Sequence, residues 1–150
     1  SKNAFTASCI YLSGTIYNTS RSYCIADDRA VWRYVMDRCR VLADDKIILD
    51  KVLLANNFLE RLVGLLRHKS LNDNEGLLLS GCRQVHTFGM KFSIDAIFIS
   101  KAGEVLYIED DLKPGKISKN VKNAFWVLEV GANKSKELNL LPHQIIIFEF

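Results

Sequence analysis

Hydrophobic residues fall in short runs that are separated by polar turns over most of the chain. The segment 113–123 is a polar loop, and Gly103 can close a three-residue hairpin by taking a positive φ. Runs of alternating or continuous apolar residues predict strands at 47–55, 77–80, 83–88, 92–100, 105–109, 124–130 and 144–150. Many short strands with few helices predict a mainly β protein of the α+β type, as an antiparallel β-sandwich, jelly-roll-like or barrel-like domain.

Two segments carry helical rather than strand patterning. Apolar residues spaced four, four and three apart predict a helix over residues 28–42. Asn57 and Glu60 form a capping box for a second helix. Residues 1–45 also differ in composition from the rest, so we expect an N-terminal extension there and a β-rich domain over residues 47–150.

Charge and cysteine usage limit the partners and the compartment. A formal net charge of +3 is weak, so we expect no nucleic-acid partner. No apolar run approaches the roughly 20 residues of a membrane span. The chain has four cysteines, none in a Cys-x-x-Cys pair, and its start lacks a signal peptide, which together predict a cytoplasmic protein. Because the chain begins with Ser, an upstream export signal could be missing from it.

Two carboxylates lie inside strongly apolar strand segments. Asp95 and Glu129 are each flanked by apolar residues, and burying a charge is costly unless the charge is paired or neutralised. Two such carboxylates could differ in pKa and act as acid and base. The structural alternative is a carboxylate held by Arg67 or by backbone N–H groups, which would lock the fold. The sequence leaves both readings open.

Other catalytic and cofactor patterns are weak. Cys82 and His86 are four residues apart, and on a strand their α-carbons would lie roughly 13 Å apart, too far for a nucleophile–base pair. The three histidines lack metal-ligand spacing, so no metal site is expected. No glycine-rich phosphate-binding loop is present, so no nucleotide cofactor is expected either.

An ordered series of short motifs runs from the second predicted helix to the last strands. The series is Glu60-Arg61-x-x-Gly64-Leu65-x-Arg67, Glu75-Gly76-Leu77-Leu78, His86-Thr87-Phe88-Gly89-Met90, Ile94-Asp95-x-x-Phe98, Pro114 and Val127-Leu128-Glu129-Val130-Gly131. Taken together these motifs resemble the domain-of-unknown-function 192 family over about residues 47–150. The chain departs from the family pattern at residues 141–144, where members often carry a Gly-Asp turn, and residues 1–45 have no counterpart.

The resemblance implies a compact β-rich domain of the jelly-roll or sandwich type, with one helix near Arg67. The family has no established activity, and some members are found beside genes for secretion and pilus assembly. The polar or ligand-facing positions of the matching motifs, which are the candidate site residues, are Arg67, His86, Thr87, Met90, Asp95 and Glu129.

The leading hypothesis is a non-catalytic, bacterial-type protein that binds a partner protein or a small ligand, as an accessory to secretion or pilus assembly. The alternative is a small hydrolase- or isomerase-like enzyme in which Asp95, Glu129 and His86 act and Arg67 clamps an anion. It requires these groups to meet in one open cleft. A third reading places partner binding on the predicted basic helix near Val31–Leu42. No cofactor and no metal are expected.

Overall fold

The computed structural model describes residues 10–12, 15–17, 24–25, 33–34, 38–55 and 70–150. The chain divides into two units, residues 1–37 and residues 38–150. The first unit contains two antiparallel strand pairs. They are β1 (Ile10–Leu12) with β2 (Thr15–Tyr17), and β3 (Cys24–Ile25) with β4 (Arg33–Tyr34).

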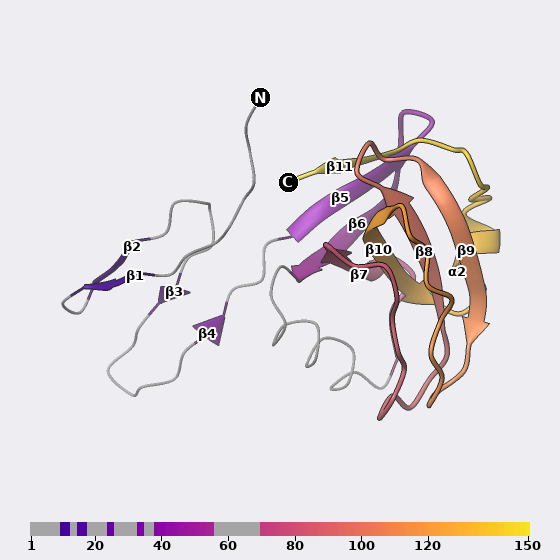
Figure 1. Ribbon diagram of the computed structural model, residues 1–150. Helices are drawn as coiled ribbons and strands as arrows, with labels where there is room; N and C mark the ends of the chain where they lie inside the picture. The colour runs from indigo at the N-terminus through magenta and orange to yellow at the C-terminus, as the bar shows by residue number, and fades with distance from the viewer. Residues whose placement is uncertain (1–9, 13–14, 18–23, 26–32, 35–37, 56–69) are drawn as a thin grey trace. The chain divides into compact units, whose positions relative to one another are not determined.

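The described residues of the second unit form one seven-stranded sheet in the order β11-β5-β6-β7-β10-β8-β9 (Figure 1). A short helix, α2 (Lys134–Glu137), follows β10. The strands are β5 (Arg38–Ala43), β6 (Lys46–Ala55), β7 (Glu75–Ser80), β8 (Ile94–Ser100), β9 (Val105–Leu112), β10 (Ala124–Gly131) and β11 (Ile146–Glu149). Neighbouring strands are antiparallel except β6 and β7, which are parallel.

The central strands are apolar on both faces, so the sheet separates two hydrophobic clusters. Ile97 and its partner Leu128 belong to the first cluster, whereas the adjacent pair Phe98 and Val127 belongs to the second. Successive side chains of a strand point to opposite faces, which explains the division. A strand buried on both sides reads as the continuous apolar run seen in β8.

The mainly β, α+β fold class is confirmed, with three differences in detail. The sheet is open, with β11 and β9 at its edges, so it is not a barrel. The parallel pair of β6 and β7 departs from an all-antiparallel arrangement. The predicted strand at 83–88 is wrong, because this segment is a loop in which only His86 forms an isolated bridge, to Ile117.

The predicted helix over residues 28–42 is wrong in its described part. Arg33 and Tyr34 form β4, and residues from Arg38 onward form β5. Cys39, Val41 and Ala43 are buried on one face of that strand. A spacing of four residues is also a multiple of two, so it fits a strand face as well as a helix face. The second predicted helix, which begins at Asn57, lies outside the described residues.

Two loops at one end of the sheet are bonded to each other and are called the loop pair here: residues 81–93, after β7, and residues 113–123, after β9. Both extend below the sheet in the view of Figure 1. Backbone bonds link them from Val121 N to Arg83 O (2.9 Å) and from Ser118 N to Val85 O (2.9 Å). The two loops are therefore held together by backbone hydrogen bonds and form one structural unit.

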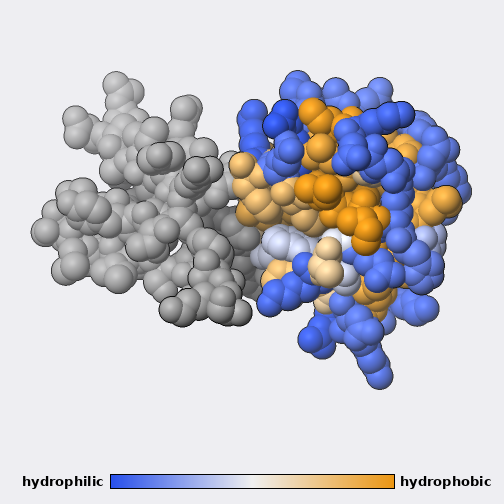
Figure 2. Space-filling view, turned by 90° about the horizontal axis from the view of Figure 1, so that it is seen from above, coloured by the Kyte–Doolittle hydropathy of each residue, from blue (hydrophilic) through white to orange (hydrophobic). Residues whose placement is uncertain are grey.

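The opposite end of the sheet carries an apolar surface. Seen from above, on the side where β11 lies in Figure 1, hydrophobic side chains gather inside a hydrophilic rim (Figure 2). Independently of this view, the C-terminal segment has four large apolar residues that are exposed, namely Leu141, Ile145, Ile147 and Phe150. Among the described residues, no helix is long and apolar enough to span a membrane.

Candidate functional site

Asp95 lies on β8 with its side chain fully buried, and its carboxylate is saturated with donors. Oδ1 accepts the backbone N–H groups of Asp111 (2.9 Å) and Asn133 (3.1 Å). Oδ2 accepts the backbone N–H (3.0 Å) and the hydroxyl (2.6 Å) of Ser135. Asp111 and Asn133 have φ values of 50° and 67°, so the carboxylate fixes two left-handed backbone positions. This is the arrangement expected of a buried charge that holds a fold together.

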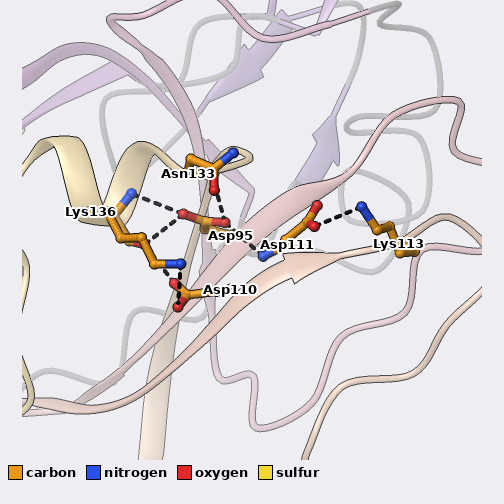
Figure 3. A network of polar contacts seen from close by, with 7 residues as sticks. Asp95, Asp110, Asp111, Lys113, Asn133 and Lys136 are labelled. Atoms are coloured by element: carbon orange, nitrogen blue, oxygen red, sulfur yellow. Dashed lines mark hydrogen bonds and ion pairs between the residues drawn. The ribbon is translucent and has the colours of Figure 1, made fainter.

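The contacts of Asp95 continue to the surface through one serine (Figure 3). The buried Ser135 hydroxyl also lies 2.8 Å from Oδ1 of Asp110, whose Oδ2 forms an ion pair with Lys136 at 3.3 Å. A hydroxyl has one hydrogen, so it can donate to only one of the two carboxylates at a time. The network joins the consecutive strands β8 and β9 to α2, which follows β10 later in the sequence.

Glu129 lies on β10 and is buried in a different way from Asp95. Only 6% of the residue is exposed, and no group in the described part of the chain donates a hydrogen bond to its carboxyl. Burial raises the pKa of Glu129 from 4.5 to about 8. At neutral pH this carboxyl is therefore mainly protonated, which removes the cost of burying a charge.

The sheet keeps the two carboxyl groups apart. Asp95 is paired with Val130, and Glu129 is paired with Ala96 on the same two strands. Directly paired residues point to the same face and consecutive residues to opposite faces. Asp95 and Glu129 therefore lie on opposite faces of the sheet, so they cannot attack one substrate from a shared cleft.

Thr87 is a buried hub that ties the two loops of the loop pair together. Its hydroxyl donates to Lys113 O (2.6 Å) and accepts the N–H of Lys116 (3.0 Å). Its backbone N–H donates to Lys116 O (2.9 Å), and its carbonyl accepts the N–H groups of Gly115 (3.0 Å) and Met90 (3.2 Å). Met90 is half-buried and packs against the second hydrophobic cluster. Both residues have their groups engaged within the fold.

His86 and Phe88, by contrast, are exposed on the loop pair. Their rings stack with centroids 5.0 Å apart, and Nδ1 of His86 accepts the N–H of Phe88 at 3.4 Å. Phe88 is 49% exposed and Ile117 is 57% exposed. The Cys82 thiol donates to Gln84 O at 3.2 Å, so both members of the weighed Cys–His pair are engaged with other groups.

The loop pair is also strongly basic. None of the 17 acidic residues of the chain falls in it. Six of the 20 basic residues do, namely Arg83, Lys91, Lys113, Lys116, Lys119 and Lys122, and all six are exposed. Lys113 forms an ion pair with Asp111 (2.7 Å), which lowers the pKa of that carboxyl, and the Lys119 ammonium lies 4.8 Å from the centre of the Tyr107 ring.

Sequence reasoning identified some of these residues and missed others. Arg67 lies outside the described residues, so its predicted role as an anion clamp or ion-pair partner stays a prediction. Ser135 and the lysines of the second loop were missed. Lysines at every third position from 113 to 122, in a segment without any acidic residue, were the available signal. Within the described ranges, no group of three or more His, Cys, Asp or Glu side chains could hold a metal ion.

Comparison with known proteins fixes the family. Residues 40–148 match the family described as "Uncharacterized ACR", domain of unknown function 192. The chain belongs to this family. The match covers most of the sheet unit, from β5 to β11, so it includes the Asp95 network and the loop pair. No curated protein matches the chain.

Two solved structures share the fold of this family member. One, from Sinorhizobium meliloti 1021, is described as a "putative transcription regulator"; it is 22% identical, with a TM-score of 0.64 over 77% of this chain and 95% of that one. The other is a protein of unknown function from Novosphingobium aromaticivorans DSM 12444, 16% identical, with a TM-score of 0.66 over 86% of this chain and 94% of that one. At these identities the likeness concerns the fold alone.

Proposed function

We propose that this protein is a non-catalytic binding module that holds an anionic partner through the loop pair. The observation that carries the proposal is the division of the motif residues into two groups. Asp95 and Thr87 are buried and fully bonded, whereas His86 and Phe88 of the same motifs are exposed at a basic surface. Buried, satisfied polar groups build the fold, and exposed aromatic residues among cations are available to a partner.

Rigidity of the loop pair supports the same function. A surface that is already ordered loses less conformational entropy on binding than one that must fold around its partner. Thr87 and the bonds from Val121 to Arg83 and from Ser118 to Val85 hold the two loops in one arrangement before any partner arrives. His86 is locked to Phe88 by stacking, so the exposed rings are also preset.

The enzyme alternative receives less support from the geometry. The enzyme alternative needs Asp95 and Glu129 in one cleft, but the strand register places their side chains on opposite faces of the sheet. Both oxygens of Asp95 are also occupied by four hydrogen-bond donors of the fold, so the carboxylate faces the interior of the domain rather than a substrate. We therefore assign Asp95 and Thr87 to the scaffold in this proposal.

A nuclear magnetic resonance titration tests the proposed function. The probes are polyglutamate, a single-stranded oligonucleotide and vesicles that contain an anionic phospholipid, each added to the full chain labelled with ¹⁵N. We expect at least one of them to shift or broaden amide signals within residues 81–93 and 113–123, with the effect weakening in high salt. Perturbation centred on Asp95, or no response to any polyanion, would show that the loop pair is not the binding site.

A further inference from the structure

We infer that the anionic partner is a phospholipid surface, with Phe88 and Ile117 entering the headgroup layer and the surrounding cations binding lipid phosphates. This inference rests on the proposed function, because it names the partner class of the same loop pair. It depends on two properties of the described loops, an exposed apolar tip and the basic residues of the loops that carry it.

The apolar tip is contiguous across the two loops. His86 and Ile117 form an antiparallel bridge, so their side chains lie on the same side of the paired loops. The His86 ring in turn stacks on Phe88. Phe88, His86 and Ile117 therefore form one exposed group, fixed from beneath by the bonds of Thr87. An aromatic and an aliphatic side chain presented together suit the boundary between headgroups and acyl chains.

The cations are placed to reinforce this insertion. Lys116 directly precedes Ile117, and Lys91 follows Phe88 by three residues. At the other end of the paired loops, the N–H of Val121 donates to Arg83 O, and Lys122 follows Val121 in the sequence. Among the described residues, no carboxylate forms an ion pair with any of these four cations. Each Lys or Arg close to an anionic membrane strengthens binding roughly fivefold, so four of them give a strongly salt-dependent affinity.

Three features favour a lipid surface over nucleic acid or an acidic protein segment. Ile117 has no ring on which a base could stack, and one side of the Phe88 ring is already covered by His86. Five of the six cations are lysines, point charges that suit a fluid array of phosphates, whereas recognition of fixed phosphates or carboxylates favours the bidentate fork of arginine. Two projecting loops can also enter a planar surface without a groove (Figure 1).

Vesicle flotation of the full chain tests the inference. The vesicles are phosphatidylcholine alone and phosphatidylcholine mixed with phosphatidylglycerol, at low and high salt. We expect flotation with the mixed vesicles only, and release in high salt. The double variant Phe88→Ser, Ile117→Ser and the double variant Lys116→Gln, Lys122→Gln should each weaken binding about tenfold or more. Thermal unfolding of each variant checks that the fold is kept.

Matched controls lie at the other end of the sheet. Ile47 is 51% exposed and Lys46 is exposed beside it at the start of β6. Ile47→Ser and Lys46→Gln remove the same kinds of side chain away from the loop pair, so they should leave flotation unchanged. If the control variants lose as much flotation as the loop-pair variants, the loop pair is not the specific membrane-binding site. Equal flotation with pure phosphatidylcholine and with the mixed vesicles would contradict recognition of anionic lipid.

The outcomes separate the two proposals. If no vesicle binds while polyglutamate or the oligonucleotide still perturbs the loop pair, the lipid assignment is wrong and the binding function stands. If neither vesicles nor the other polyanions bind, both fail. Flotation that requires Phe88, Ile117, Lys116 and Lys122 but not Ile47 or Lys46 supports both.

Discussion

Glu129 is the residue whose chemistry can be tested most directly. Its pKa is raised from 4.5 to about 8 by burial, so between these pH values the folded chain keeps a proton that the unfolded chain releases. The free energy of unfolding should therefore fall as the pH rises through this window, by on the order of 5 kcal/mol in total. Glu129→Gln keeps the shape and cannot ionise, so its stability should lack this fall. Urea unfolding at about pH 5 and about pH 9 measures the difference.

The control for this prediction is Asp50→Asn, which changes a carboxylate on the exposed side of β6. It should follow the pH profile of the unmodified chain. Identical profiles for the unmodified chain and Glu129→Gln would mean that Glu129 is ionised in the folded state. A cation would then have to face it, and Arg67 would be the first candidate to substitute next.

At the scale of single residues, the sequence predicted which carboxylates are buried but not which groups form hydrogen bonds with them. Carboxylates in apolar strands were enough to single out Asp95 and Glu129, and both are buried. The donors to Asp95 come from Asp111, Asn133 and Ser135, up to 40 residues further along the chain. Which backbone N–H groups converge on a side chain depends on strand order and turn geometry, and no local pattern encodes that.

At the scale of elements, the turn between β8 and β9 joins the hairpin to the edge strand β11. Gly103 has a φ of 97°, and a β-carbon there would lie 2.5 Å from Ile146 O, while Ile146 N donates to Gly103 O at 2.8 Å. Gly103→Ala should therefore lower the free energy of unfolding by about 2–4 kcal/mol, through backbone strain and displacement of β11. Chemical denaturation followed by circular dichroism measures the loss.

Gly115 provides the comparison for this substitution. Its φ of 74° is also positive, but nothing lies within 4 Å of the position that a β-carbon would occupy. Gly115→Ala should thus lose only about 1 kcal/mol, the cost of a left-handed conformation. Equal losses at Gly103 and Gly115 would show that the contact with β11 adds nothing to the stability of the turn.

Prediction of helices and strands succeeded where the residue pattern fits only one kind of secondary structure. It failed where the same residue spacing fits two kinds. The central strands were found because continuous apolar runs bounded by turns have few other interpretations. The helix predicted over strand β5 is wrong because the four-residue spacings that lead up to Cys39 suit a helix face and a strand face equally. The segment 83–88 alternates like a strand, yet its backbone bonds go to the loop 113–123, so it belongs to the loop pair.

At the scale of the whole molecule, the net charge of the chain does not show how its charged residues are distributed over the surface. A net charge of +3 argued against a nucleic-acid partner, but the loop pair alone holds six basic and no acidic residues. Those residues come from two separate segments, 81–93 and 113–123, which the hydrogen bonds of Thr87 and of the paired backbones bring together. The sequence therefore contained the charges, and the fold was needed to reveal that they share one surface.

The boundary of the sheet unit is the last feature that can be tested. Strand β5 lies between β6 and β11, and it adds Cys39, Val41 and Ala43 to the first hydrophobic cluster. Burial raises the pKa of the Cys39 thiol to about 12, as expected for a cysteine that acts as an apolar core residue. A domain cut at residue 46 would leave β11 without its neighbour and open that cluster to water. We therefore place the start of the domain near Arg38.

Two truncated chains, residues 38–150 and residues 46–150, distinguish these boundaries. The longer one should unfold cooperatively in urea with a midpoint close to that of the full chain, since it keeps every strand of the sheet. The shorter one should lose the cooperative transition, because several buried apolar side chains disappear at once. Val41→Asp in the full chain places a charge at the same fully buried position and should be similarly damaging. Cooperative unfolding of residues 46–150 would instead show that β5 is an appendage and that the core closes without it.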